Sequence, residues 1–249
     1  MLKTLAAYRL MKHCDEDRVF VVEGVKLCNE AMLSGFHIRT VCATEDWCES
    51  HAGSLPAECD MYVVTAEQLE RLSLMRSPNK VWMLVDRPAP QPLMADADVL
   101  IALDGLQDPG NMGTILRTAD WYGIRQLICS PDTVSCYNPK VVQASMGAIF
   151  RTAVTYCDLP AFLKQHAAMG YAVYGAMLDG NDLYNSALQR PAILVVGNEG
   201  RGLSEVVEAS LTCRLTIPNI GGTCESLNAA VAAAILMSEF VGRRSPSAK

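Results

Sequence analysis

Short apolar runs alternate with helical patterns along most of this chain, and that alternation limits the possible folds more than any other feature. In the second half we expect strands at residues 99–103, 126–129, 172–176, 193–196 and 214–217, and helices at 112–122, 139–149, 161–168 and 227–240. In the first half we expect strands at 19–22, 41–43, 61–64 and 81–85, and helices at 26–34 and 66–72. Such alternation predicts α/β layers, with a mostly parallel sheet in the larger half.

A proline-rich stretch divides the chain. Residues 87–97 have the sequence RPAPQPLMADA, in which three alternate prolines remove backbone donors and stiffen the chain. We interpret this stretch as a linker between a domain at residues 1–90 and a second domain at residues 98–249.

Composition excludes several classes of protein. Of the 249 residues 50% are hydrophobic and 19% charged, which excludes a disordered chain. The longest apolar run, Ala229–Met237, is too short to span a bilayer, and we find no signal peptide. The 10 cysteines form no Cys-x-x-Cys pair, so we expect no metal site of that design. Because we find no export signal, we expect reduced thiols and a cytoplasmic location. The net charge of −6 argues against a nucleic-acid coat protein, but an enzyme with a local basic patch remains compatible with it.

The first segment that could carry chemistry is Leu103–Tyr122, LDGLQDPGNMGTILRTADWY. After the strand, Asp-Pro-Gly-Asn predicts a turn, and a helix is expected to begin near Asn111, which is suited to be its N-cap. Arg117 follows six residues later and could face the strand ends, where ligands bind in open α/β sheets. Taken alone, Asn111 is explained as a cap and Arg117 as a surface ion pair.

The second segment is Ile193–Ser204, ILVVGNEGRGLS, in which an apolar strand leads directly into glycines. Three of the six residues Gly197–Gly202 are glycines, so the backbone there carries few side chains and a ligand could lie directly against it. Their order is neither the dinucleotide fingerprint nor a P-loop. The pattern alone predicts a tight turn as readily as a ligand site.

The third segment is Leu215–Phe240, in which a strand ends in Ile-Pro and a loop with two adjacent glycines follows. A helix that is apolar on all sides then begins at Ser226 or Asn228, and it must be buried in a core or against another subunit. Capping explains at most two of the polar residues Glu225, Ser226 and Asn228 at its N-terminal end.

In their order and spacing, the three segments resemble motifs one, two and three of the SpoU (TrmH-type) branch of the SPOUT methyltransferases. Motif one, Asn-x-Gly-x-x-x-Arg, matches Asn111–Arg117, and motif two, Gly-x-Glu-Gly-x-Gly, matches Gly197–Gly202. Motif three, Ser-Leu-Asn a few residues after Ile-Pro, matches Ser226–Asn228. Two departures are Asn219, where the family commonly has methionine, and a slightly longer spacer through Gly221–Cys224.

The first half adds a fourth match. Val19–Lys26 resembles the Phe-x-Val-Glu-Gly-x-Lys stretch of the family's substrate-binding domain, which is similar to a ribosomal protein that grips RNA bends. The resemblance therefore implies a small ribosomal-protein-like α/β domain followed by a SPOUT domain, whose parallel sheet carries a deep trefoil knot.

The resemblance also implies an activity and its partners. The expected reaction is S-adenosylmethionine-dependent methylation of a ribose 2′-hydroxyl in structured RNA, either rRNA or tRNA. The expected assembly is a homodimer joined through the C-terminal helix, with neither a membrane nor a metal involved.

Roles for individual residues follow from the same resemblance. Arg117 would be the general base or, because arginine rarely loses its proton, a donor that stabilises the alkoxide. The other expected catalytic residues are Asn111, Glu199, Ser226 and Asn228. The expected cofactor-binding residues are Gly197, Glu199, Gly200, Gly202, Ile217, Pro218 and Leu227. The expected substrate-binding residues are Glu23 and Lys26, which lie in the fourth match, and Arg39, Arg76 and Lys80. These last three, with Arg71, are our own candidates for phosphate contact among the basic residues of the first half and do not come from the resemblance.

Two other classes of function are alternatives. A non-catalytic RNA-binding protein could retain this fold, because a fold does not by itself prove an activity. A nicotinamide-dependent oxidoreductase is disfavoured, because the turn at residues 104–113 lacks the phosphate-binding fingerprint. Thermal melting with S-adenosylmethionine against NAD separates these classes.

Overall fold

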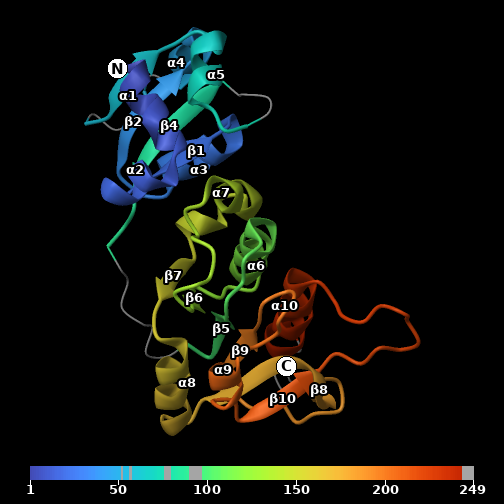
Figure 1. The fold of residues 1–249 in the computed structure, drawn as a ribbon. Helices are drawn as coiled ribbons and strands as arrows, with labels where there is room; N and C mark the ends of the chain where they lie inside the picture. The colour runs from blue at the N-terminus through green and yellow to red at the C-terminus, as the bar shows by residue number, and fades with distance from the viewer. Residues whose placement is uncertain (52, 56–57, 76–79, 90–96, 243–249) are drawn as a thin grey trace, which may run out of the picture. The chain divides into compact units, whose positions relative to one another are not determined.

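The structure is a computed structural model that describes residues 1–51, 53–55, 58–75, 80–89 and 97–242. The chain forms two compact units (Figure 1). The first comprises Met1–Pro90 and Tyr137–Arg151, and the second comprises Gln91–Cys136 and Thr152–Lys249. Most of the expected linker at 87–97 lies outside the described residues.

The first unit contains a four-stranded sheet in the order β1–β4–β2–β3. Its strands are β1 (Val19–Glu23), β2 (Ile38–Ala43), β3 (Asp60–Val63) and β4 (Val81–Asp86). Strand β4 pairs antiparallel with β1 and β2, whereas β2 and β3 are parallel. The α-helices of this unit are α1 (Leu2–Leu5), α2 (Met11–Glu16), α3 (Val25–Leu33), α4 (Glu45–His51), α5 (Ala66–Leu72) and α7 (Pro139–Ser145).

Strand β1 is buried along its whole length, which explains its continuous apolar sequence. On one face Val19 and Val21 pack in a core with Trp82. Phe20 has its ring centroid 5.0 Å from Tyr137 and 6.1 Å from Phe150. These aromatic contacts explain why Tyr137–Arg151, although distant in sequence, belongs to the first unit.

The second unit contains a six-stranded sheet in the order β10–β8–β9–β5–β6–β7. Every neighbouring pair is parallel, which confirms the predicted parallel sheet. Its strands are β5 (Val99–Leu103), β6 (Gln126–Cys129), β7 (Ala153–Tyr156), β8 (Ala172–Asp182), β9 (Ala192–Val196) and β10 (Cys213–Thr216). Its α-helices are α6 (Pro109–Trp121), α8 (Leu159–Ala168), α9 (Glu205–Glu208) and α10 (Ala229–Met237), and a π-helical turn follows at Ser238–Gly242.

Some predicted elements differ from the observed ones. The helix expected at 139–149 is interrupted, because Met146 has a left-handed φ of 50° and Gly147 a φ of 93°. Strand β8 continues to Asp182, well beyond the expected residue 176. Strand β7 was not predicted because it is a four-residue edge strand without a fully buried residue.

The start of α6 also differs, and this difference affects the site. The N-cap is Asp108, whose Oδ1 accepts a hydrogen bond from the backbone N–H of Asn111 at 2.7 Å. The prediction that Asn111 caps this helix is therefore wrong. Asn111 lies inside the first turn instead, so its side chain is available for other contacts.

Helices in the described part of the chain are all too short or too polar to cross a membrane.

Candidate active site

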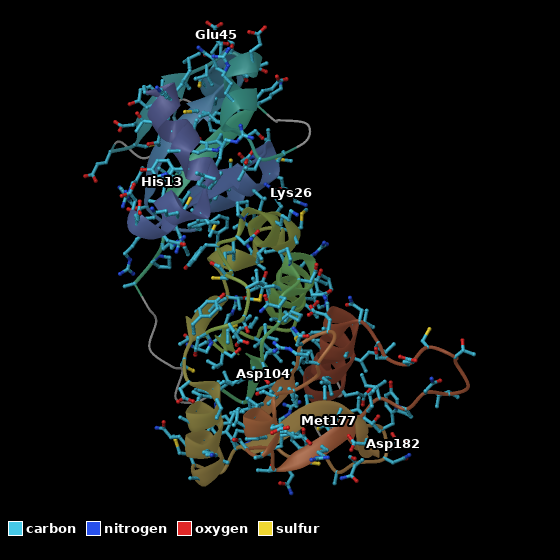
Figure 2. The ribbon with its side chains drawn as sticks, viewed as in Figure 1. His13, Lys26, Glu45, Asp104, Met177 and Asp182 are labelled. Atoms are coloured by element: carbon cyan, nitrogen blue, oxygen red, sulfur yellow. The ribbon has the colours of Figure 1, made fainter. Side chains whose placement is uncertain are left out.

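Strands β5 and β9 are paired so that Leu103 lies opposite Val196, and their carboxyl ends lie side by side. The loop after each strand is tied to the other. Asp104, which is 7% exposed, donates its backbone N–H to Val196 and accepts the N–H of Ser204 on Oδ2 at 2.6 Å. This carboxyl edge of the sheet (Asp104 in Figure 2) therefore brings motifs one and two together.

The glycine loop after β9 is a tight turn held by Asn198. Its Oδ1 accepts the N–H groups of Gly200 and Arg201, at 2.9 and 3.1 Å, while its backbone exchanges two 2.9 Å hydrogen bonds with Gly202. A Cβ on Gly197 would lie 2.4 Å from the carbonyl of Gly202, so only glycine permits this approach. The interpretation as a tight turn thus holds, and Gly197 serves the turn itself.

Gly200 and Gly202 differ from Gly197 in their surroundings. Beside Gly200, the nearest atom to an added Cβ is a side-chain oxygen 3.7 Å away, and nothing lies within 4 Å of a Cβ on Gly202. The backbone is therefore accessible at both positions. Gly202 also needs its glycine because its φ is +71°.

Glu199 and Asn111 are joined by their side chains. Nδ2 of Asn111 donates to Oε1 of Glu199 at 2.9 Å, and the backbone N–H of Asp108 donates to the same oxygen at 3.4 Å. Asn111 is 9% exposed, whereas Glu199 is exposed. The carboxylate is therefore fixed on one oxygen and open to solvent on the rest of its surface.

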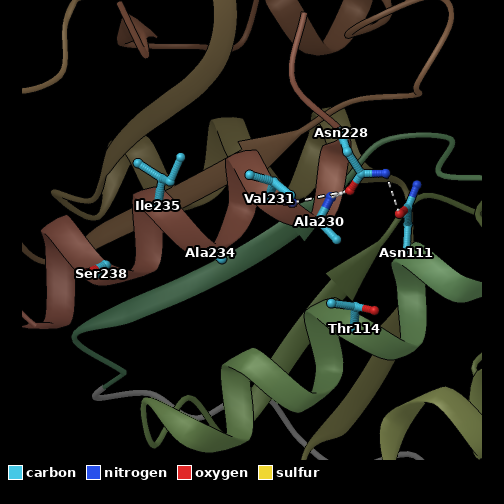
Figure 3. Close-up of a pocket in the computed structure, with 8 residues that line it drawn as sticks. All are labelled: Asn111, Thr114, Asn228, Ala230, Val231, Ala234, Ile235 and Ser238. Atoms are coloured by element: carbon cyan, nitrogen blue, oxygen red, sulfur yellow. Dashed lines mark hydrogen bonds between the residues drawn. The ribbon is translucent and has the colours of Figure 1, made fainter.

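Asn228 extends this connection to the third motif (Figure 3). Its Nδ2 donates to Oδ1 of Asn111 at 2.9 Å, and its Oδ1 caps α10 by accepting the N–H groups of Ala230 and Val231. The expected helix start at Asn228 is confirmed. Three side chains from the three motifs, Glu199, Asn111 and Asn228, thus form one continuous hydrogen-bonded chain.

A groove of about 370 Å³ runs between α6 and α10, beside this hydrogen-bonded chain (Figure 3). Asn111 and Asn228 lie at its polar part, and the rest is lined by Thr114, Ala230, Val231, Ala234, Ile235 and Ser238. Helix α10 is therefore not buried on all sides. Ala233 and Leu236 face the core at 1% exposure, whereas Val231 is 47% exposed.

Arg117 does not join the hydrogen-bonded chain. At about 100° per helical residue it lies about 240° around α6 from Asn111, whereas Thr118 returns to nearly the same face. Its side chain is exposed and, within the described residues, makes no hydrogen bond or ion pair.

The third-motif loop after β10 is exposed from Asn219 to Asn228, including Ser226, and Leu227 is 48% exposed. Ile217 and Pro218 are half-buried at its start. Asn219 organises the two-glycine spacer: its Oδ1 accepts the N–H of Gly222 at 2.6 Å, and its Nδ2 donates to the carbonyl groups of Gly222 and Cys224. The residue that departs from the family motif thus holds the turn that the longer spacer requires.

Glu23, an expected RNA contact, is instead a buried structural group. It is 5% exposed, and it accepts hydrogen bonds from the Ser73 hydroxyl and from the N–H of Leu74 at 3.0 Å. Burial raises the pKa of the Glu23 carboxyl above its ordinary value. The expectation of direct substrate contact is therefore wrong for Glu23, which holds the turn after α5.

The basic residues expected to bind RNA have different surroundings. Arg39 is paired with Asp86 and donates to the carbonyl of Asp17 at 3.0 Å. Lys80 is paired with Asp46, and its hydrogen bond lowers the pKa of that carboxyl to about 2. Lys26 is exposed on α3 (Figure 2), and Arg76 lies outside the described residues.

Across the described residues, no three His, Cys, Asp or Glu side chains are grouped so that they could hold a metal ion. A parallel α/β sheet with amide and carboxylate side chains at its carboxyl edge is the arrangement of an enzyme domain that binds its ligand at the strand ends. Residues 98–238 match the model of the SpoU rRNA Methylase family, and residues 1–82 match the MRM3-like substrate binding domain. The chain belongs to the SpoU rRNA Methylase family.

Relatives extend this similarity over nearly the whole chain. The 23S rRNA (guanosine(2553)-2′-O)-methyltransferase RlmP of Bacillus subtilis is 28% identical over 232 residues, covering 93% of this chain and 92% of that protein. A solved structure of a putative RNA methyltransferase of the TrmH family from Porphyromonas gingivalis has a TM-score of 0.89 and 40% identity, covering 98% of this chain and 97% of its own. An AdoMet-bound rRNA methyltransferase from Sinorhizobium meliloti has a TM-score of 0.84 and 29% identity, covering 96% and 93%.

Proposed function

We propose that this protein transfers a methyl group from S-adenosylmethionine to a ribose 2′-hydroxyl of structured RNA. The observation that carries the proposal is the hydrogen-bonded chain Glu199–Asn111–Asn228, at 2.9 Å for each link. It joins three motifs at the carboxyl edge of a parallel sheet, where a ligand can reach all of them. Both RlmP of Bacillus subtilis and the AdoMet-bound relative support this function.

The cofactor site that we propose is formed by the glycine loop and the third-motif loop. Gly200 and Gly202 fit this role because a Cβ at either position would enter space that the protein leaves open. Their backbone groups would contact the cofactor, while Ile217, Pro218 and Leu227 would cover its apolar parts. Gly197 and Glu199 would shape and orient the loop. When bound, S-adenosylmethionine supplies the methyl group as an electrophile on a positively charged sulfur.

The side chains of this protein must orient the ribose and accept its proton. Asn111 uses its amide oxygen and one amide N–H within the hydrogen-bonded chain, so its orientation is fixed. Oε2 of Glu199 makes no hydrogen bond within the described residues and is open to accept one from the ribose hydroxyl. Ser226, which is exposed beside Asn228, would contact the same ribose.

Arg117 is the proposed donor to the oxygen that develops negative charge. Arginine normally keeps its proton, so electrostatic stabilisation by the guanidinium suits it better than general-base catalysis. Because its side chain is exposed and lacks a partner within the described residues, it can approach RNA without first breaking an ion pair. The hydroxyl proton then passes to a carboxylate or phosphate oxygen as the oxygen–methyl bond forms and the sulfur–methyl bond breaks.

We propose a homodimer in which α10 and the exposed side of α6 meet a second copy. Val231 on α10 is 47% exposed and Trp121 on α6 is 85% exposed, so both helices present large apolar side chains that a second copy could cover. Both helices border the groove described above, so a second copy would cover it. The small residues Ala230 and Ala234 would permit close approach of the helices.

The finer features of the family are also proposals. The loops at the carboxyl edge would form the deep trefoil knot, and the unit containing Met1–Pro90 would be the ribosomal-protein-like RNA-binding domain. The match of residues 1–82 to a substrate-binding domain supports the latter. Lys26, Arg39, Arg76 and Lys80 are its proposed phosphate contacts. We propose a cytoplasmic location, where the scattered thiols stay reduced.

The experiment is methylation of unmodified rRNA and tRNA transcripts by the full chain with radiolabelled S-adenosylmethionine. We expect label at one nucleotide, which resists alkaline cleavage because its 2′-oxygen is blocked. The same assay is repeated with RNA from a strain that lacks the gene. If the protein binds the cofactor and RNA but transfers no methyl group to any of these RNAs, it is a non-catalytic RNA-binding protein. Lack of cofactor binding would contradict the proposed site.

A further inference from the structure

A second polar cluster, formed by Ser130, Asp132 and Arg201, lies at the same carboxyl edge and is not used by the mechanism above. Ser130 and Asp132 follow β6, and Arg201 is in the glycine loop after β9. The three side chains meet at Gly105, in the loop between β5 and α6. The cluster therefore joins the loops of three parallel strands.

Asp132 is held firmly in this cluster. Its Oδ1 accepts the hydroxyl of Ser130 at 2.6 Å, and that hydroxyl accepts the backbone N–H of Gly105 at 2.8 Å. The side chain of Gln107 donates to the backbone carbonyl of Asp132 at 2.5 Å. The carboxylate is thus a fixed negative charge beside the site.

Arg201 has a fixed backbone and a long, exposed side chain. The turn at Asn198 holds its N–H, and the side chain is 75% exposed. Its guanidinium lies over Gly105, since a Cβ added to that glycine would be 3.5 Å from Nη2. The same Nη2 is 3.9 Å from Oδ2 of Asp132, whose side chain is 60% exposed. Such a distant, exposed ion pair contributes little to the stability of the fold.

The position of this loose pair indicates what it does. Arg201 is two residues from Glu199, whose carboxylate contacts Asn111. Its guanidinium lies over Gly105, in the loop that leads from β5 to the first turn of α6, where Asn111 lies. RNA that enters here brings phosphates, and the carboxylates of Glu199 and Asp132 repel them. Because the net charge of the chain is −6, the positive charge that binds these phosphates must come from individual side chains near the site. A guanidinium suits this role because it forms two parallel hydrogen bonds with a phosphate.

We infer that Arg201 binds a phosphate of the substrate RNA beside the target ribose, and that it exchanges Asp132 for this phosphate when RNA binds. Asp132 keeps the guanidinium over Gly105 in the absence of RNA and competes with the phosphate for it. This inference rests on the proposed RNA substrate and adds a specific phosphate contact to it.

A matched pair exists at the opposite edge of the same sheet. Arg190 precedes β9 and Asp98 precedes β5, so their pair lies at the amino ends of these strands. Nη1 of Arg190 is 2.6 Å from Oδ2 of Asp98, with side-chain exposures of 38% and 59%. Changes to this pair control for the general effect of removing a surface charge.

The test compares Arg201→Ala, Arg201→Lys and Asp132→Asn with Arg190→Ala and Asp98→Asn in the full chain. The probe is an unmodified rRNA or tRNA transcript, whose affinity is measured by fluorescence anisotropy at several salt concentrations. Apparent KM and kcat are measured on the same transcript, and the Kd for S-adenosylmethionine is measured by calorimetry.

We expect Arg201→Ala to raise the Kd and KM for RNA about five- to tenfold and to reduce the salt slope of RNA binding by about 1, as for one lost phosphate contact. The kcat at saturating RNA and the cofactor Kd should change less than about twofold. Arg201→Lys should recover only part of the affinity, because lysine lacks the planar fork. Asp132→Asn should tighten RNA binding, because the competing charge is removed while Ser130 keeps an acceptor.

Two results would overturn the inference. One is an Arg201→Ala variant whose RNA affinity and salt slope match those of Arg190→Ala. The other is weaker RNA binding in Asp132→Asn, because a purely structural pair would shift affinity in the same direction whichever partner is removed. RNA affinity does not depend on turnover, so failure of methyl transfer by the unaltered protein contradicts the proposed function without deciding the role of Arg201.

Discussion

Nδ2 of Asn228 donates a hydrogen bond to Oδ1 of Asn111 at 2.9 Å, so the N-cap of α10 is attached to the first turn of α6. The same Asn228 satisfies backbone donors of its own helix through Oδ1. One side chain thus stabilises a helix end and orients the amide that holds Glu199. These two roles can be separated by substitution.

Asn228→Ser should keep the cap and lose the link, because a serine hydroxyl caps helices well but cannot reach Asn111 as the amide does. We expect its free energy of unfolding to stay near that of the unaltered protein, while methyl transfer falls at least about tenfold. Asn228→Ala should lose both roles and destabilise the protein by about 1 kcal/mol. Denaturant unfolding and turnover check this, and full activity of the serine variant would remove Asn228 from the site.

Glu199→Ala and Glu199→Gln should both fold normally, because Glu199 is exposed and its removal leaves no buried cavity. Glutamine can still accept the hydrogen bond from Asn111 but cannot take a proton. We expect turnover to fall by about 10²–10⁴ in both variants, with little change in melting temperature. If the glutamine variant alone keeps most of the activity, the role of Glu199 is to orient Asn111 and not to accept the ribose proton.

Arg117→Ala and Arg117→Lys should both be nearly inactive at saturating RNA. Lysine keeps the charge but loses the planar fork that contacts an alkoxide or phosphate at two points. Both variants should bind S-adenosylmethionine normally by calorimetry, because Arg117 makes no hydrogen bond or ion pair within the described residues. Restored turnover in the lysine variant would mean that a positive charge is sufficient, and loss of cofactor binding would place Arg117 in the cofactor site.

Val231→Asp should produce monomers that remain folded. Val231 is 47% exposed beside the groove, so aspartate there is tolerated in one chain but opposes an apolar contact with a second copy. Ala233→Asp is the contrasting change, since Ala233 is 1% exposed and a buried carboxylate should unfold the protein. Sedimentation and circular dichroism distinguish the two effects, and an unaltered protein that sediments as a monomer would contradict the proposed dimer.

Glu23 should make stability depend on pH. Its pKa is raised in the folded protein, so between the ordinary glutamate pKa and the raised value the folded state binds more protons than the unfolded state. The free energy of unfolding should therefore fall as pH rises through that window, and the stabilising effect of the protonated form should be complete below it. Glu23→Gln should flatten this part of the profile in urea unfolding at several pH values. An unchanged slope would show that Glu23 is not the group responsible.

Most of the strands, the longer helices, the parallel character of the larger sheet and a helix start at Ser226 or Asn228 were predictable, because apolar runs and capping residues are recognised among residues close together in sequence. Alternating apolar runs report burial of the strands, and an Asn before an apolar helix reports a cap. The resemblance of three segments to the SpoU motifs identified Asn111, Glu199 and Asn228 as site residues. The capping pattern was misleading at α6, because both Asp108 and Asn111 are suitable N-cap residues and the structure has Asp108 as the N-cap.

Contacts between distant residues could not be predicted in this way. Asn111 meets Glu199 across 88 residues and Asn228 across 117, and these meetings depend on the strand order of the sheet. Glu23 was expected to contact RNA, yet it is 5% exposed and accepts hydrogen bonds from Ser73 and Leu74 of a later segment.

Tyr137–Arg151 likewise belongs to the first unit through Phe20 on β1. The periodicity of a segment indicates which of its faces is buried, and a capping residue indicates that the backbone groups at a helix end are hydrogen-bonded. Which other segment covers that face or contacts that helix end is decided only when the whole chain packs, because many segments of similar composition could pack there equally well.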